Sequence, residues 1–349
     1  MDNLVLEYRD PLLGIILIVA LIFLISFFTY SYSIYKEKNA RKDYRKLSLR
    51  FELGKLKEED YVHLYKTYNL PFDSILLLAS SFLHKGDYNK AISVYLALLE
   101  HVKDRVKKEE LLELLGTTYF KGGFLQRSKE IFLRILKFSP HNKNALTYLL
   151  LIHEKLKDFK KAKEIAFCLE ELNKPMDMDK IYLDSLIILN DSILSFEKRT
   201  ELLYEIFKKH KIIERVFATF LIQFNKTFFW EHIKEFDCSK FIDVMWYLKA
   251  DNINFDKVME NQFLVELYNA KGYLNTIKHS NDFDLDILIL INTHEHKIKA
   301  SLDFEFICKS CKHSYPMFDT RCSHCHSILS FEVKHHLTKS FYEFNQSLQ

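Results

Sequence analysis

The chain has 349 residues, enough for two or more domains or for one elongated array. Seven glycines and five prolines are too few turn residues for an all-β protein of this size, so we expect a mainly α-helical fold. The 50 basic residues nearly balance the 47 acidic ones, at a formal net charge of +3, which argues against a dedicated nucleic-acid-binding protein.

The first element that we expect is a transmembrane helix. Residues Pro11 to Phe28 form a stretch without charge. At a rise of about 1.5 Å per residue, this stretch spans roughly 27 Å, which is close to the hydrocarbon thickness of a bilayer. A cleaved signal peptide is the alternative, but the preceding residues are acidic rather than basic and no Ala-x-Ala cleavage site follows. We therefore assign residues 1–35 to an N-terminal transmembrane anchor, with the span at about 11–30.

Basic residues set the expected orientation of this helix. They follow it closely in the sequence, as Lys36, Lys38, Arg41, Lys42, Arg45, Lys46 and Arg50. The positive-inside rule then places the N-terminus outside and the bulk of the chain in the cytoplasm. We interpret residues 36–70 as a basic juxtamembrane linker that could hold an eroded first repeat.

A repeated pattern comes next in the chain. Three segments between residues 75 and 169 place small and aromatic residues as tetratricopeptide repeats do. Their equivalent small residues, Ala91, Ser128 and Ala162, are 37 and 34 residues apart. Small side chains at these positions let two antiparallel helices approach, and each pair must stack on the next because it cannot bury its apolar face alone. We expect a tetratricopeptide-repeat α-solenoid over residues 71–175.

Partners bind such arrays on the concave face. By resemblance to tetratricopeptide repeats, we expect twelve side chains to line this groove. Their mixed character suggests that the groove binds a peptide or a protein. They are Leu76, Ser80, Leu83, His84, Glu113, Thr117, Phe120, Lys121, Thr147, Leu151, Glu154 and Lys155.

Residues 176–300 keep a helical periodicity but have no clear repeat signature. We interpret this region as degenerate helical repeats. A separate helical domain is the alternative.

Four of the six cysteines form two Cys-x-x-Cys pairs, Cys308 with Cys311 and Cys322 with Cys325. Ten residues separate the first pair from the second. Two such knuckles supply four thiolates to a tetrahedral metal ion, so we predict a structural zinc site, with iron as the minor alternative. Structural disulfides do not suit a cytoplasmic location, and a redox motif would not need a matching second pair.

The cysteine pairs belong to a small C-terminal zinc ribbon, which we assign to residues 301–335, with a tail at 336–349. Because four thiolates leave no open coordination position, we expect no catalysis at the metal. No other motif in the chain indicates an enzyme, and we predict no catalytic residue. A nucleic-acid-binding ribbon is disfavoured because acidic residues accompany the basic ones in Phe304–Phe331 and around it.

The order of anchor, basic stretch, repeats and rubredoxin-like ribbon resembles the lipopolysaccharide assembly protein B (LapB) family. The likeness is carried by residues 75–172, by Arg41–Tyr44 after the membrane segment, and by the ten-residue gap between the cysteine pairs. The chain departs from the family pattern at Lys312, where Gly is usual, at Ser323, where Pro is usual, and at Thr320, where Trp is usual.

This resemblance implies an inner-membrane adaptor that regulates lipopolysaccharide synthesis. Such a protein would bind protein clients in the repeat groove and act with a membrane AAA+ protease on a deacetylase of lipid A biosynthesis. A general membrane-tethered tetratricopeptide scaffold for another envelope or secretion complex is the alternative. Co-purification with the protease or the deacetylase would distinguish the two.

Overall fold

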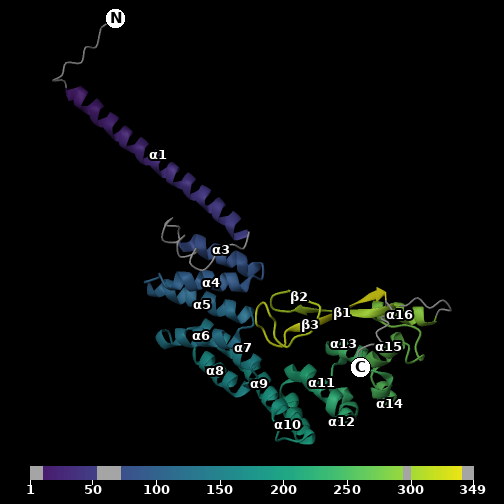
Figure 1. Cartoon of the computed structure of the whole chain (residues 1–349). Coiled ribbons are helices and arrows are strands. Elements are labelled where there is room, and N and C mark those ends of the chain that lie inside the picture. Colours follow the sequence, from purple (N-terminus) through teal and green to yellow (C-terminus); the bar gives the residue numbers. More distant parts are fainter. Residues whose placement is uncertain (1–10, 53–71, 294–299, 340–349) are drawn as a thin grey trace. The chain divides into compact units, whose positions relative to one another are not determined.

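The computed structural model describes residues 11–52, 72–293 and 300–339, and the chain is mainly helical, as predicted (Figure 1). It divides into two compact units, Met1–Ile152 and His153–Gln349. The described helices that begin in the first unit are α1 (Pro11–Glu52), α3 (Phe72–His84), α4 (Tyr88–Leu99), α5 (Arg105–Lys121), α6 (Leu125–Phe138) and α7 (Lys143–Lys155).

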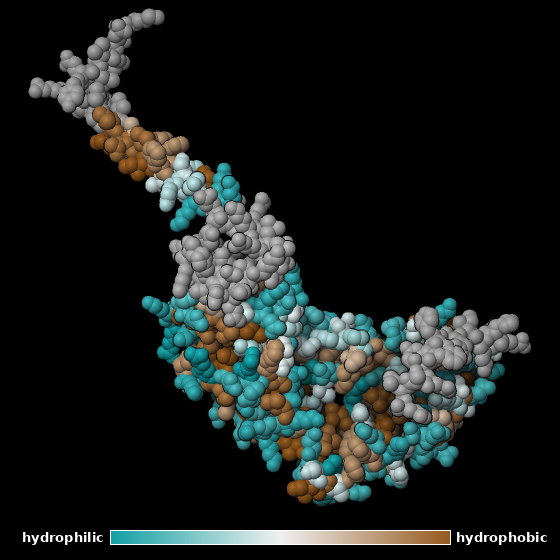
Figure 2. All heavy atoms as spheres, viewed as in Figure 1, coloured by the Kyte–Doolittle hydropathy of each residue, from teal (hydrophilic) through white to brown (hydrophobic). Residues whose placement is uncertain are grey.

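The apolar N-terminal segment forms the long helix α1. Within it, Leu17–Lys36 is a stretch of 20 residues with a mean hydropathy of 2.1, long enough to cross a membrane and not buried by the protein. Figure 2 shows this hydrophobic stretch in brown, followed by more polar residues in white and teal. The Thr29 hydroxyl donates to the backbone carbonyls of Ile25 and Ser26 at 2.9 Å, so this polar group is satisfied within the helix. The structure confirms the predicted helix of membrane-spanning length. Signal sequences also form apolar helices of this length.

One type of turn ends the first helix of each repeat. After α3, the N–H of Asp87 donates to the Phe82 carbonyl at 2.9 Å, and Gly86 has a φ of 78°. The equivalent bond follows α5 at 2.8 Å and α7 at 2.9 Å, with Gly123 at a φ of 80° and Lys157 at 59°. These are Schellman turns, which need one residue in the left-handed region. Their recurrence supports the tetratricopeptide-type repeat predicted from the sequence.

Small residues let the helices of a repeat approach closely, as the sequence predicts. Ala91, Ser128 and Ala162 are fully buried. The Ser128 hydroxyl donates to the Gly116 carbonyl at 2.7 Å, which ties α6 to α5. A Cβ atom on Gly116 would lie 2.8 Å from the ring of Phe132, too close for any larger side chain without a shift of that ring. These residues are therefore core positions of the repeat.

The second unit begins with the end of α7 and continues as a row of helices. Consecutive helices from α8 to α11 pack on their neighbours. The longer helices are α8 (Phe159–Glu171), α9 (Asp177–Asn190), α10 (Phe196–Lys209), α11 (Glu214–Phe224), α15 (Gln262–Ala270) and α16 (Phe283–Thr293).

Between α11 and α15 the helices become short and irregular. The longest of them, α12, has six residues. The helical periodicity seen in the sequence thus gives longer helices as far as α11 and again at α15 and α16, with short elements between α11 and α15. These short elements are α12 (Lys226–Glu231), η2 (Ile233–Glu235), η3 (Cys238–Phe241), α13 (Ile242–Trp246), η4 (Ala250–Asn252) and α14 (Phe255–Val258); one further short element, η1 (Lys211–Ile213), directly precedes α11.

A three-stranded antiparallel sheet follows, in the order β2-β1-β3. Its strands are β1 (Ala300–Cys308), β2 (Ser314–Tyr315) and β3 (Phe331–Lys339). The register pairs Ala300 with Lys339 at one end and Cys308 with Phe331 at the other. Strand β3 therefore runs past residue 335, where the sequence prediction ended the ribbon.

The ribbon shares one hydrophobic core with the helices of the second unit. Leu302, Phe304 and Phe306 alternate along β1 and are buried in the same cluster as Phe217 and Leu288. Alternate residues of a strand point to one face, so β1 uses that face to cover the helices. The ribbon is thus joined to the helical array along β1, which ends at the first cysteine, Cys308, and the other three cysteines follow in the loops.

Candidate metal centre and repeat surface

The four predicted metal ligands lie together in the structure. The Sγ atoms of Cys308, Cys311, Cys322 and Cys325 are all within 4.8 Å of one another. Cys308 Sγ lies 3.6 Å from Cys325 Sγ, and Cys311 Sγ lies 3.6 Å from Cys322 Sγ. A tetrahedral site with Zn–S bonds of about 2.3 Å needs sulfur atoms about 3.75 Å apart. The thiol set therefore fits a four-coordinate metal ion such as zinc or iron.

The two knuckles have the same backbone. In the first, the Cys308 N–H donates to the His313 carbonyl at 2.9 Å, and Lys312 has a φ of 62°. In the second, the Cys322 N–H donates to the Ser327 carbonyl at 2.9 Å, and His326 has a φ of 60°. Each chain reversal therefore places a non-glycine residue in the left-handed region, directly after the second cysteine.

Hydrogen-bond donors surround the first cysteine of each knuckle. The hydroxyls of Ser327 and Ser330 lie 3.3 Å from Cys308 Sγ, and the Tyr315 hydroxyl lies 3.3 Å from Cys322 Sγ. Burial raises the pKa of Cys308, but the two serines and nearby backbone N–H groups outweigh burial and lower that pKa to about 5. These donors thus favour the thiolate form of Cys308, the form that metal ions bind. At Cys311, a backbone hydrogen bond with His313 lowers the pKa, but burial and the neighbouring thiols outweigh this bond and raise that pKa to about 12.

Two histidines flank the thiols without completing the ligand set. The rings of His313 and His324 stack with their centroids 3.7 Å apart, beside Cys311. Nearly parallel rings direct their nitrogen lone pairs into separate planes, which does not suit chelation of one ion. The four thiols make a complete tetrahedral set, as the sequence predicts.

The second knuckle is bonded to the helices through Arg321. Its Nε and Nη2 donate to Glu154 Oε2 at 3.0 and 2.7 Å, and Nη2 also donates to Asp179 Oδ1 at 2.8 Å. The side chains of Arg321, Glu154 and Asp179 are only 12, 13 and 16% exposed. Next to them, the Tyr182 hydroxyl donates to Thr320 Oγ1 at 2.7 Å. Burial raises the pKa of Tyr182 to about 12.

A second arginine holds the loop between the knuckles. Arg215 of α11 makes a two-pronged ion pair with Asp243, and both side chains are nearly buried. The face of the same guanidinium lies 3.7 Å from the ring centroid of Phe318. Arg321 and Phe318 therefore fix the ribbon to the helices in addition to the buried residues of β1.

No protein-family model matches this chain, and no curated protein matches it. Among solved structures, the chain is similar to one titled "MamA RS-1 ArsTM double mutant". The two are 17% identical, the match covers 58% of this chain and 97% of that chain, and the TM-score is 0.36. The tetratricopeptide-type assignment rests on the repeated turns and the buried small residues described above.

The twelve predicted groove residues all lie on the first helix of a repeat, that is, on α3, α5 or α7. His84, Lys121 and Lys155 are exposed, and eight of the others are half-buried. Leu151 is buried, at 3% exposure, so its side chain is not accessible to a partner. Glu154 is held by Arg321. Of the four predicted groove residues of α7, Leu151 and Glu154 are thus already covered, while Lys155 is exposed.

Glu113 also has partners, because it accepts hydrogen bonds from Asn142 and Asn144 at 2.6 Å. The ring of Phe120 packs edge-on against Tyr148, with centroids 5.4 Å apart. These groove residues help to join α5 to the start of α7. His84 and Lys121 are the predicted groove residues of the first two repeats that the structure leaves most exposed.

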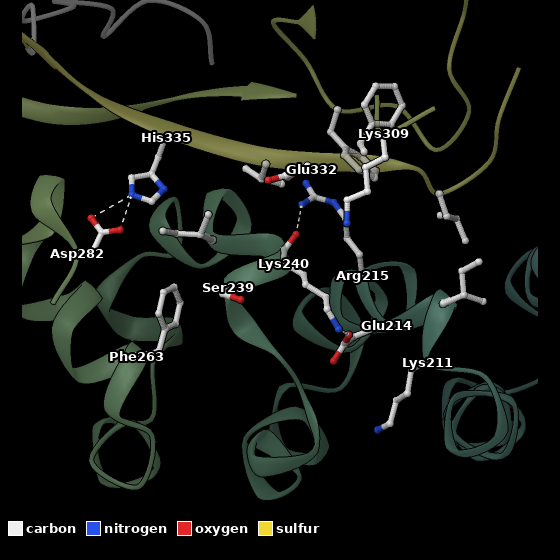
Figure 3. A pocket seen from close by; sticks show the side chains of 16 residues that line it. Lys211, Glu214, Arg215, Ser239, Lys240, Phe263, Asp282, Lys309, Glu332 and His335 are labelled. Atoms are coloured by element: carbon white, nitrogen blue, oxygen red, sulfur yellow. Dashed lines mark hydrogen bonds and ion pairs between the residues drawn. The ribbon is translucent and has the colours of Figure 1, made fainter. Parts of the chain in front are cut away.

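A cavity of about 700 Å³ lies in the second unit, under strand β3 (Figure 3). Its wall carries charges of both signs, several of them paired. Lys240 Nζ lies 2.9 Å from Glu214 Oε2, and His335 Nε2 lies 3.1 Å from Asp282 Oδ2. Asp282 also accepts the N–H groups that begin α16, so it has a structural role as a helix cap. We assign no ligand to this cavity.

Proposed function

We propose that this chain is a membrane-anchored adaptor that binds client proteins through its tetratricopeptide-type repeats. The observation that carries the proposal is the presence, in one chain, of a membrane-length helix and a series of repeated helical pairs. A helix such as α1 confines the protein to the membrane surface, and repeat arrays present extended surfaces to other proteins. We further propose that the N-terminus lies outside and the bulk of the chain in the cytoplasm, because basic residues follow the apolar segment.

The metal centre has a structural role in this proposal. The mutual distances of the four thiols support a closed site, which leaves no position for a substrate or an activated water. We propose zinc as the metal and no enzymatic activity for the chain. The metal then supplies folding energy to the knuckles, and the knuckles bond to the helices through Arg321 and Phe318.

The client class is proposed from the resemblance to the LapB family. On that basis, the adaptor regulates lipopolysaccharide synthesis at the inner membrane, acting with a membrane AAA+ protease on a lipid A biosynthesis deacetylase. A general scaffold for another envelope or secretion complex remains the second candidate, since repeats of this kind serve many assemblies.

Affinity purification of the full-length protein from its own cells tests both candidates. We expect the wild type to retain the protease or the deacetylase, and K121E to lose them because it reverses the charge of an exposed groove side chain. K137E makes the same change at an exposed position of α6 that lies outside the predicted groove, and it should retain the clients. Recovery of an unrelated envelope complex would favour the second candidate, and equal capture by both variants would exclude the groove.

A further inference from the structure

The second knuckle places an arginine against an acidic face of the helices. This face consists of Glu154 at the end of α7, and Asp179 and Tyr182 on α9. Arg321 satisfies both carboxylates at once and also donates to the His326 carbonyl of its own knuckle at 2.9 Å. With the knuckle in place, Glu154 and Asp179 are largely shielded from water, so this guanidinium compensates the charge of two neighbouring carboxylates. The acidic face is therefore built to receive a guanidinium group.

The chemistry of the acidic face selects arginine over lysine. The guanidinium donates to Glu154 through Nε and Nη2, Nη2 also donates to Asp179, and Nη1 donates to the His326 carbonyl. A lysine ammonium is a point charge and cannot make the same planar, two-pronged contact. Beside this contact, Tyr182 bonds to the small hydroxyl of Thr320. The acidic face thus recognises an extended segment with an arginine that follows a hydroxyl residue.

The position of Arg321 depends on the metal-binding loop. From Lys309 to Ser327, Cys322 is the only buried residue, so the loop has almost no core of its own. Metal binding supplies the folding energy of such small knuckles. In contrast, Leu302, Phe304 and Phe306 anchor β1 in the shared core whether or not the metal is bound. Loss of the metal should therefore leave the loop attached only through the contacts of Arg321 and Phe318, which a competing peptide can replace at Arg321, and should leave the strands in place.

We propose that the acidic face of Glu154, Asp179 and Tyr182 is a binding site for an arginine-bearing extended peptide of a partner protein. Arg321 occupies this site while the knuckles hold their metal, and loss of the metal opens it. This inference rests on the proposed adaptor function. It adds the chemistry of one partner, an arginine-bearing peptide, and the event that controls its binding, loss of the metal. Its test reads peptide binding directly, so it can fail or succeed independently of client capture through Lys121.

The test compares the metal-loaded and the metal-stripped full-length protein in detergent under reducing conditions. The probe is a fluorescent peptide of residues 317–328 that carries C322S and C325S, so that it cannot bind metal. We expect the stripped protein to bind this peptide about tenfold or more tightly than the loaded protein, as the loss of a charged hydrogen-bonded contact implies. The same peptide with R321K should bind several-fold more weakly.

Matched variants of α9 and α7 show whether the acidic face is the site. In the stripped protein, E154Q combined with D179N should abolish peptide binding. D184N removes another carboxylate of α9, one that pairs with Lys163, and should leave binding unchanged. Hydrogen exchange of the stripped protein should rise in residues 309–327 and stay low in 300–306, which shows that the helices and strands remain folded.

Competition between the peptide and the knuckle gives a second readout. Because metal-bound knuckle and peptide exclude each other, thermodynamic linkage requires the peptide to lower the apparent zinc affinity by the factor by which zinc weakens peptide binding. Equal peptide binding by the loaded and stripped forms would overturn the proposal. Three other results would also overturn it. The stripped protein could fail to bind the peptide although residues 309–327 have opened, the E154Q/D179N variant could bind it fully, or the loop could stay protected from exchange without metal.

Discussion

Lys312 and His326 occupy equivalent positions in the two knuckles, each directly after the second cysteine. Both have positive φ values, 62° and 60°, which cost a residue with a side chain about 1 kcal/mol relative to glycine. The backbone conformation of each knuckle therefore lowers the stability of the folded protein slightly, relative to a chain with glycine at these two positions.

Substitution of glycine at Lys312 should relieve this strain. We expect K312G to raise the free energy of unfolding of the metal-loaded protein by about 1 kcal/mol, measured as a shift in thermal unfolding. K312A keeps a Cβ atom and should leave stability nearly unchanged. If K312A stabilises the protein as much as K312G, removal of the lysine charge is the cause and the backbone explanation is wrong.

The six cysteines should differ sharply in reactivity. Cys168 is exposed, whereas burial raises the pKa of Cys238 to about 12 and keeps its thiol protonated at neutral pH. In the metal-loaded protein at pH 8, we expect a thiol reagent to modify Cys168 quickly, and the four ligands and Cys238 slowly. Chelation of the metal should expose the four ligands to the reagent, while Cys238 stays unreactive.

C168S provides the control for this experiment. It should remove the fast phase in the loaded protein and leave the chelator-dependent phase intact. Fast modification of all four ligands before chelation would mean that no metal is bound by these thiols.

At the scale of elements, β1 does two things at once. One face of the strand packs into the core that the second unit shares with the ribbon, and its last residue, Cys308, belongs to the four-thiol set. From the loops, Arg321 contacts α7 and α9, and Phe318 contacts Arg215 of α11. Strand β1 therefore connects the four-thiol site directly to the hydrophobic core of the helices.

Alternation along β1 predicts opposite effects for neighbouring residues. Phe304 is buried in the shared core, and we expect F304A to lower the free energy of unfolding by about 3–5 kcal/mol. Glu305 is next to it on the other face, and E305A should change stability by less than about 0.5 kcal/mol. Denaturant unfolding of the metal-loaded protein measures both. Similar effects of the two substitutions would contradict the shared core.

Local sequence patterns predicted the elements that depend on near neighbours. The buried small residues Ala91, Ser128 and Ala162 follow from repeat spacing, and the thiol set follows from two knuckles with fixed internal geometry. The turn at Lys157 was less visible, because a lysine there takes the place of the glycine that ends α3 and α5.

Sequence patterns could not predict the contacts between segments that lie far apart in the chain. Arg321 and Glu154 are 167 residues apart, and nothing in the spacing of either marks them as partners. For the same reason, the sequence suggested a groove position at Glu154 where the structure has an internal ion pair. The short helices from α12 to α14 carry helical periodicity, but packing around one aromatic core decides their lengths.

At the scale of the whole molecule, the chain combines a membrane-length helix, tetratricopeptide-type repeats and a ribbon with a thiol cluster. The adaptor proposal assigns one task to each part: α1 for attachment, the repeats for client binding, and the ribbon for control of the acidic face. The repeats therefore carry the central claim, because an adaptor must hold another protein.

Site-specific photo-crosslinking in living cells tests this claim most directly. A photoreactive amino acid replaces Lys121 in the predicted groove, and Lys137 on α6 serves as the matched exposed control. The account predicts a discrete adduct with a membrane-associated protein at position 121 and none at position 137. The same adducts at both positions, or none at 121 in a stably expressed protein, would contradict client binding by the groove.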